Sequence, residues 1–226
     1  MGIIFFVRHG ESESNKLLHD KLYTNRSDLL EKLNLLGDPS LTDKGIKQSQ
    51  YTAEYLFKKI TQKYSHVNIL ISPIQRTVQT ATPFIHLCES CESNQFKYTT
   101  QYLPELQEYT SPTKNIKGKL TCLGNPLIVD TSWDNFCSRV LNIVNIMEDK
   151  SAGTPTVIFG HSRFISTVCS FVSSQKNHMV EKKSDVSFQI PSCSITPLSY
   201  NNNHWDIYRV GSIEHLPESL QTGTHY

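Results

Sequence analysis

Three short, mostly apolar runs constrain the fold of this chain more than any other feature. They are Ile3–Val7, Val67–Ile71 and Thr156–Phe159. A continuous run of this length, without polar alternation, is typical of a strand buried on both faces of a sheet. Stretches with helical spacing separate the runs, so strands and helices alternate along most of the chain. This order predicts an α/β fold: a three-layer sandwich whose mainly parallel central sheet is flanked by helices.

Local signals place the remaining elements. Thr42 can cap a long helix over residues 42–60. Ser72 as cap, with Pro73 at the first helical position, predicts a second helix over residues 73–86. The other expected elements are helices over 132–148 and 163–174, a strand over 98–102, and a hairpin of 192–198 with 205–210 around Asn201-Asn202-Asn203.

Composition limits the classes of partner. The chain has 226 residues, and its 22 Lys and Arg nearly balance its 21 Asp and Glu. A nucleic-acid or anionic-membrane binder needs a basic surplus, and no apolar run approaches the roughly 20 residues that span a bilayer. We therefore expect no nucleic-acid partner and no membrane association, and a soluble, cytoplasmic protein. Residues 1–215 are expected to form a single domain and residues 216–226 a poorly ordered polar tail. The oligomeric state stays open.

The six cysteines indicate neither a disulfide framework nor a metal centre. Without a secretion signal they are most simply free thiols. Cys88 and Cys91 form a C-x-x-C pair, which is one half of a zinc-binding pattern. A four-ligand site needs a second pair or nearby histidines, and His86 is the only neighbour. We therefore expect no metal site and no cofactor.

Polar side chains follow each of the three buried runs. Arg8 and His9 end the first run, with Asn15 shortly after; Arg76 follows the second and His161 the third. Ligands of parallel sheets bind at the carboxyl ends of the strands, so these side chains should converge. Arginine forks, histidines and the unpaired amides of helix N-termini all suit phosphate oxygens. The strand ends therefore predict a phosphoryl-binding site.

These segments closely resemble the histidine phosphatase superfamily, which includes cofactor-dependent phosphoglycerate mutases and many phosphomonoesterases. The resemblance extends from residue 3 to about residue 170 and implies the same three-layer fold. The matching segments are Arg8-His9-Gly10 for the R-H-G signature, residues 38–48 for D-P-x-L-T-x-x-G-x-x-Q, residues 72–81 for S-P-x-x-R-x-x-Q-T-A, and His161 for the second histidine.

The resemblance implies a role for each of these residues. His9 resembles the nucleophile, which attacks phosphorus as a neutral imidazole and becomes a phosphohistidine. The phosphate-binding set that it implies is Arg8, Asn15, Arg76 and His161, whose donors stabilise the charge of the transferring group. Gly10 is expected to keep the backbone small where it passes the phosphate.

The resemblance also implies that the general acid lies in an L-x-E segment after the arginine helix. An alkoxide is a poor leaving group, so a carboxyl group must protonate it. Both Leu103-Pro104-Glu105 and Leu106-Gln107-Glu108 fit, and Glu108 is the closer match to the phosphatase-like members. Glu105 stays as the alternative. Arg163 is also open: it either contacts a second anionic group of the substrate or forms a surface salt bridge.

The predicted function is phosphomonoester hydrolysis through a phosphohistidine on His9, with Glu108 as general acid and base. The substrate is expected to be a small phosphorylated molecule or a phosphopeptide. Residues 16–37 form a long connection that is expected to cover the mouth of the site. One alternative is a phosphoglycerate mutase-type phosphomutase, although the E-R-H-Y-G segment and Arg-Arg pair of those enzymes are missing. The other alternative is a non-catalytic module that binds phosphorylated ligands.

Overall fold

A computed structural model describes residues 2–19, 26–91, 96–110, 121–124, 126–150, 153–174 and 188–222. Within these residues one sheet has the strand order β3-β2-β4-β1-β5-β6. The strands β1, β4, β2 and β3 pair in parallel, whereas β5 is antiparallel to both β1 and β6. The expected, mainly parallel sheet is thereby confirmed. The strands are β1 (Gly2–Arg8), β2 (His66–Ile71), β3 (Lys97–Tyr102), β4 (Thr156–Gly160), β5 (Ile195–Asn201) and β6 (His204–Ile207).

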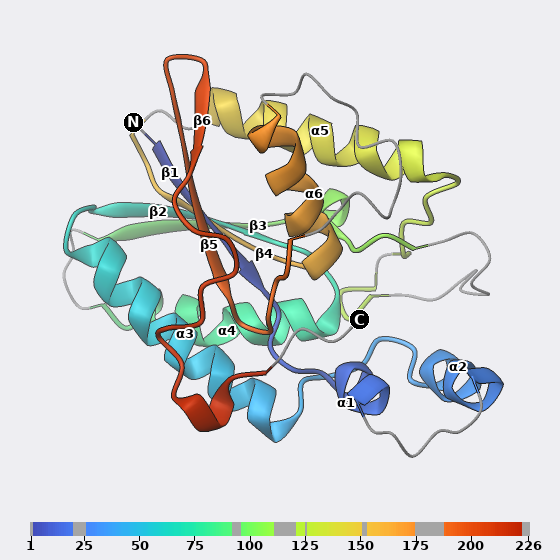
Figure 1. Ribbon diagram of the computed structural model, residues 1–226. Coiled ribbons are helices and arrows are strands. Elements are labelled where there is room, and N and C mark those ends of the chain that lie inside the picture. The colour runs from blue at the N-terminus through green and yellow to red at the C-terminus, as the bar shows by residue number, and fades with distance from the viewer. Residues whose placement is uncertain are drawn as a thin grey trace.

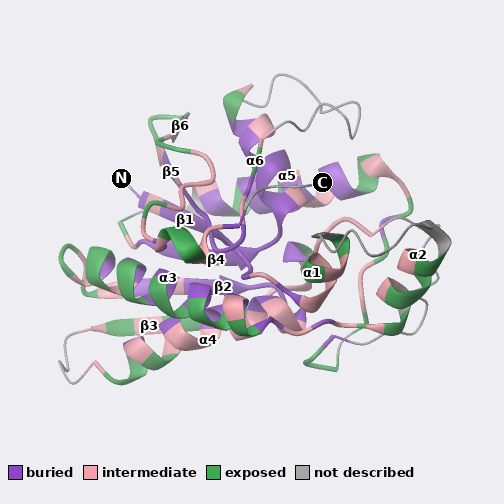
Figure 2. Ribbon diagram, turned by 60° about the horizontal axis from the view of Figure 1, so that its bottom comes forward, coloured by how far each residue is buried: buried purple, intermediate pink, exposed green. Residues whose placement is uncertain are grey.

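Helices cover both faces of this sheet, as expected for three layers (Figure 1). α3 (Asp43–Thr61) and α4 (Gln75–Glu89) lie on one face, and α5 (Trp133–Lys150) and α6 (Ser162–Ser173) lie on the other. Successive β1 side chains enter opposite cores: Ile4 and Phe6 pack with α5 and α6, and Phe5 and Val7 pack with α3 and α4. Burial on both faces explains why β1 reads as an unbroken apolar run, and Figure 2 shows the central strands buried.

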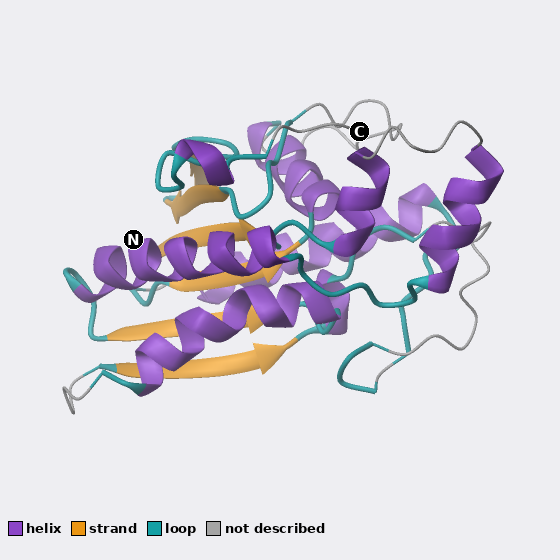
Figure 3. Cartoon of the chain, turned by 90° about the horizontal axis from the view of Figure 1, so that it is seen from below, coloured by secondary structure: helices purple, strands orange, loops and turns teal. Residues whose placement is uncertain are grey.

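Two helices that the sequence did not predict follow β1. They are α1 (Glu13–His19) and α2 (Arg26–Leu35), and they lie beyond the carboxyl ends of the strands (Figure 3). The two helices, which make up most of the described part of residues 16–37, thus lie on the same side of the sheet as the predicted phosphate-binding residues. None of the described helices combines the length and the apolar character that crossing a membrane requires.

The start of α4 differs from the expectation. The helix begins at Gln75 rather than residue 73, and no side chain of the preceding residue caps it. The Asp38 carboxylate instead accepts hydrogen bonds from the Gln75 amide at 3.0 and 2.9 Å. Ser72 is not a cap because its hydroxyl lies 2.9 Å from Nε2 of His161. The expected cap of α3 is confirmed, since Thr42 Oγ1 accepts from the Gly45 amide at 3.1 Å.

The segment 216–222, expected to begin a poorly ordered tail, packs against α3 instead. Leu216 is buried, and the Leu220 carbonyl accepts a 2.6 Å hydrogen bond from Nε2 of Gln48. Lys44 Nζ donates to the carbonyl of Gln221 at 3.2 Å. These contacts use backbone carbonyls, which polar composition does not reveal, so the boundary at residue 216 does not separate a tail from the domain. Residues 223–226 lie outside the described part.

Candidate active site

The carboxyl ends of three adjacent strands form the site. β4 lies between β1 and β2, and its carbonyls hold the residues that follow both neighbours. The His9 amide donates to the Gly160 carbonyl at 3.0 Å, and the Ser72 amide donates to the Phe159 carbonyl at 3.1 Å. The strand order therefore brings together segments that are about 60 to 150 positions apart in the chain, as their numbers show.

His9 is buried, and its ring orientation is fixed. Nδ1 lies 2.7 Å from the Gly10 carbonyl, which can only accept, so Nδ1 carries the proton. Nε2 therefore keeps its lone pair, and Nε of Arg76 donates to it at 3.2 Å. Burial lowers the pKa of His9 well below its ordinary value, and the charges of Arg76 and Arg8 lower it further. The imidazole is consequently neutral and has a defined tautomer.

His161 faces His9, with ring centroids 5.4 Å apart. Its Nδ1 lies 3.4 Å from Nη2 of Arg76, and its Nε2 lies 2.9 Å from the Ser72 hydroxyl. Because a guanidinium only donates, Nε2 carries the proton in this arrangement. Burial, followed by the charges of Arg76 and Arg8, lowers the pKa of His161 well below its ordinary value. The Ser72 hydroxyl can also donate, so it is compatible with either tautomer of this ring.

Two arginines, the buried Arg8 and the partly buried Arg76, give the site its positive charge. Arg8 donates to the Ile190 carbonyl through Nη1 at 2.6 Å. Arg76 bonds both histidines; burial lowers its pKa, and the nearby Asp38 and Glu108 carboxylates partly offset that effect. A guanidinium group in contact with two neutral imidazoles has the chemistry that suits a small anion.

Asn15, in α1, is positioned by Ser12. Its Oδ1 accepts from the Ser12 amide at 3.2 Å and from the Ser12 hydroxyl at 2.8 Å. Both contacts use the carboxamide oxygen. The amide nitrogen is therefore the end of the side chain that suits donation to an anion.

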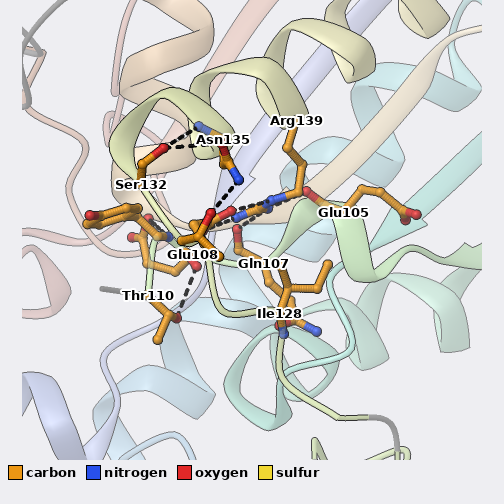
Figure 4. A network of polar contacts seen from close by, with 11 residues as sticks. Glu105, Gln107, Glu108, Thr110, Ile128, Ser132, Asn135 and Arg139 are labelled. Carbon is orange, nitrogen blue, oxygen red and sulfur yellow. Dashed lines mark hydrogen bonds and ion pairs between the residues drawn. The ribbon is translucent and has the colours of Figure 1, made fainter. Parts of the chain in front are cut away.

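Glu108 and Glu105 have different environments. Glu108 is half-buried, and its Oε2 accepts a 3.1 Å hydrogen bond from the Arg163 amide at the start of α6, beside His161. Its Oε1 accepts from the Tyr109 amide at 3.0 Å. The Glu105 side chain is exposed and points away from Glu108 (Figure 4). Of the two candidate acids, Glu108 is the one whose carboxylate contacts the start of α6, two residues after His161.

The helix N-termini beside the site are occupied by carboxylates. We expected their amides to be open to phosphate, but Asp38 caps α4 and Glu108 caps α6. A negative charge is favourable at either position because of the helix dipole. These two helix N-termini are therefore not open to a phosphate group. The Arg163 guanidinium makes no hydrogen bond or ion pair with the residues that the structure describes, and both of its expected roles stay open.

Gly10 is required by packing against α3. A Cβ atom on Gly10 would lie 2.7 Å from the Gly45 carbonyl oxygen, and one on Gly45 would lie 2.0 Å from the Glu11 carbonyl oxygen. We expected Gly10 to make room for phosphate, whereas the close neighbour in the structure is the helix backbone. The two glycines let the loop after β1 lie directly on the first turn of α3.

Three motif residues hold the loops around the site. Gln48 Oε1 accepts from the Glu11 amide at 2.8 Å, and Thr80 Oγ1 accepts from the Gly10 amide at 3.0 Å. Gln79 Oε1 accepts from the Leu41 amide at 2.8 Å. These side chains hold the backbone directly after His9 and the backbone at Leu41.

A comparison with protein families agrees with this geometry. The family model described as "Histidine phosphatase superfamily (branch 1)" matches residues 4–213. The chain belongs to this superfamily. None of the curated proteins matches the sequence significantly.

Solved structures of other histidine phosphatase-fold proteins superpose on nearly the whole chain. The ecdysone phosphate phosphatase of Bombix mori, in complex with tungstate, has a TM-score of 0.60 at 18% identity, covering 100% of this chain and 97% of that one. The phosphoserine phosphatase of Entamoeba histolytica, in complex with 3-phosphoglyceric acid, has a TM-score of 0.58 at 18% identity, covering 96% of this chain and 100% of that one. The α-ribazole phosphatase of Shigella flexneri has a TM-score of 0.60 at 16% identity, covering 93% of this chain and 96% of that one. At these identities the likeness establishes the fold.

The described part of the chain contains no cluster of three His, Cys, Asp or Glu residues arranged to hold a metal ion. Cys88, from the C-x-x-C pair, lies near the end of α4 and is buried in the core. Burial raises the pKa of its thiol to about 12, so it is protonated at neutral pH. A protonated thiol is a poor metal ligand.

Sequence reasoning missed two contributors to this candidate site. Ser72 was predicted as a helix cap, and its contact with His161 had no local signal. Arg139, in α5, holds the loop that carries Glu108 through the carbonyls of Glu105 and Gln107. Its partners lie more than 30 positions earlier in the chain, which helical spacing alone does not reveal.

Proposed function

We propose that this protein hydrolyses phosphomonoesters through a phosphohistidine formed on His9. The observation that carries the proposal is the tautomer of His9. Its Nδ1 proton is bound by the Gly10 carbonyl, so the neutral Nε2 lone pair lies in a site lined by arginine. A neutral imidazole with its lone pair exposed to an electrophile is the form that acts as a nucleophile.

The reaction runs in two steps. Nε2 of His9 forms a bond to phosphorus as the bond between phosphorus and the ester oxygen breaks, and the carboxylic acid of Glu108 gives its proton to that oxygen. Glu108, now a carboxylate, then takes a proton from water as the water oxygen attacks phosphorus. The N–P bond breaks, and its electron pair returns to Nε2. One residue thus acts as acid and then as base.

Side chains stabilise the charge of the transferring group. The proposed phosphate-binding set is Arg8, Asn15, Arg76 and His161. An incoming phosphate oxygen would replace His9 and His161 as acceptor for the Arg76 donors. Arg8 is buried and Arg76 is partly buried, so their guanidinium groups interact with a charged transition state more strongly than they would in water.

The position of Glu108 supports its role as the acid. Its carboxylate contacts the start of α6 beside His161, and it is close enough to Arg76 to influence the pKa of that guanidinium. The exposed Glu105 side chain has neither relationship. Three structural neighbours named as phosphatases support hydrolysis over phosphoryl transfer between two positions of one substrate. A small phosphorylated molecule is the proposed substrate.

The test is phosphate release from p-nitrophenyl phosphate by the wild type and by His9→Asn, with exposed His86→Asn as the matched control. Acid-labile, alkali-stable phosphate on the wild type in quenched reactions, absent from His9→Asn, would support the phosphohistidine. Equal turnover by His9→Asn and the wild type would overturn the proposal. Efficient interconversion of 2- and 3-phosphoglycerate with little hydrolysis would instead support the mutase. We expect EDTA to leave the rate unchanged.

A further inference from the structure

A buried ion pair lies behind the loop that carries Glu108. Arg139 in α5 binds the Asp130 carboxylate through two hydrogen bonds, Nε to Oδ1 at 3.1 Å and Nη2 to Oδ2 at 2.7 Å. The two side chains are 10% and 3% exposed. Removing one partner from such a pair leaves a buried charge without compensation, so the two are expected to remain together.

The same guanidinium also holds the loop itself. Its Nη1 donates to the carbonyl of Glu105 at 2.6 Å and to that of Gln107 at 2.8 Å. Figure 4 shows Arg139 reaching down from its helix to the backbone immediately before Glu108. Four of the five donors of one planar group are therefore used. Lysine, with a single ammonium, cannot reproduce this pattern.

Further contacts limit how far this loop can move. The Leu106 side chain is fully buried, and Oε1 of Gln107 accepts from the Ile128 amide at 2.8 Å. The Arg139 guanidinium packs over the ring of Phe136, 5.0 Å from its centroid. The backbone from 105 to 107 is thus fixed to α5, and Glu108 is the next residue along it.

We propose that Arg139, supported by Asp130, is a positioning residue for Glu108. This inference rests on the proposed function, in which Glu108 protonates the leaving group. A proton donor must lie within hydrogen-bond reach of the atom that it protonates. A displacement of the donor by about 1 Å from that position greatly lowers the rate. Arg139 contacts the loop backbone, so it acts through the placement of the acid and not through the phosphate.

The experiment compares two leaving groups. p-Nitrophenolate leaves without protonation, whereas the alkoxide of glycerol 2-phosphate requires it. We expect Arg139→Gln to lower kcat/KM for glycerol 2-phosphate about tenfold to a hundredfold. The value for p-nitrophenyl phosphate should stay within about threefold, because the phosphate-binding side chains are untouched. Arg139→Lys should not restore the loss. Equal losses for both substrates, or no loss, would overturn the inference.

Two further variants distinguish a loss of positioning from a general loss of stability. Val140→Ala, the next residue in α5 and fully buried, should destabilise the fold without changing the ratio between the two substrates. Asp130→Asn keeps the Arg139 contacts with the loop and should give a smaller, substrate-selective loss. If Arg139→Gln does not fold, Asp130→Asn carries the test, and an unchanged ratio in that variant would overturn the inference.

The double variant separates this inference from the proposed function. In a Glu108→Gln background, Arg139→Gln should cause no further substrate-selective loss, because the acid that it positions is already gone. A further selective loss would overturn the inference alone. If Glu108→Gln by itself spares glycerol 2-phosphate, the acid role in the proposed function fails, and the inference that depends on it fails as well.

Discussion

Nε of Arg76 donates a hydrogen bond to Nε2 of His9 across 3.2 Å, so the arginine covers the lone pair that the proposed reaction uses. An entering phosphate must take that donor for its own oxygen and thereby free Nε2. Arg76 would in this way bind the substrate and expose the nucleophile in a single step.

Arg76→Lys should therefore lower kcat/KM for p-nitrophenyl phosphate by about a hundredfold or more, because a point charge cannot bond a phosphate oxygen and both rings. Steady-state kinetics at neutral pH provide the measurement. The exposed Arg209, paired with Glu214, offers a control, and Arg209→Lys should be neutral. Activity of Arg76→Lys within threefold of the wild type would argue against this role.

Ser72→Ala should slow turnover by about tenfold, a loss of about 1 to 1.5 kcal/mol for one hydrogen bond to a functional ring. The hydroxyl lies 2.9 Å from Nε2 of His161 and helps to hold the orientation of the ring. Ser49→Ala is the matched control, since Ser49 is also buried but its hydroxyl bonds the Ile46 carbonyl within α3. Similar kinetics for the two alanine variants would contradict the prediction.

Glu108→Gln should lower kcat for an alkyl phosphate by about a hundredfold to ten-thousandfold, the usual range for a lost general acid. Glu105→Gln should have no effect, because the exposed Glu105 side chain points away from the site. Inorganic phosphate release from glycerol 2-phosphate measures both. The reverse pattern would assign the acid to Glu105.

Gly10→Ala should destabilise the fold by about 1–3 kcal/mol, and Gly45→Ala by more. Each added Cβ would lie too close to a backbone oxygen, at 2.7 Å for Gly10 and 2.0 Å for Gly45. Gly160→Ala is the control, because no heavy atom lies within 4 Å of the Cβ that it would add. In urea unfolding, Gly45→Ala should be the least stable variant, Gly10→Ala the next and Gly160→Ala the most stable. Equal unfolding midpoints for the three would refute the packing argument.

Stability should fall as the pH drops below about 6.5. Burial lowers the pKa of His215 to about 4, so between these values the unfolded chain binds a proton that the folded protein does not. Above pH 6.5 both states are neutral and the effect vanishes. Such a histidine contributes a slope of up to about 1.4 kcal/mol per pH unit.

His215→Asn should therefore make stability less dependent on pH between 6.5 and 4. The free energy of unfolding, measured in urea at several pH values, tests this directly. The exposed His204→Asn serves as control and should keep the wild-type slope. An unchanged slope in His215→Asn would mean that the buried ring is not responsible.

The strands could be predicted because burial on both faces leaves a plain signature in the sequence. Ile3–Val7 and Thr156–Phe159 became β1 and β4 with only small changes at their ends. α2 could not be predicted in the same way, since residues 26–35 form no apolar stripe. Helix periodicity reports only on helices that bury one face.

The residues that follow the strands could also be predicted, but their partners could not. His9 and His161 follow strands that pair with each other, so the topology alone brings them together. Ser72 bonds a residue 89 positions away, and Asp38 caps a helix 37 positions later. Such contacts depend on the finished packing and carry no local signature.

One side chain connects the loop after His9 to the last described segment of the chain. Gln48 accepts from the Glu11 amide at 2.8 Å and donates to the Leu220 carbonyl at 2.6 Å. Opening either segment would break a hydrogen bond of the same buried carboxamide. The two segments should therefore exchange their amide hydrogens as one cooperative unit, and a phosphate analogue bound beside His9 should slow exchange as far away as residue 220.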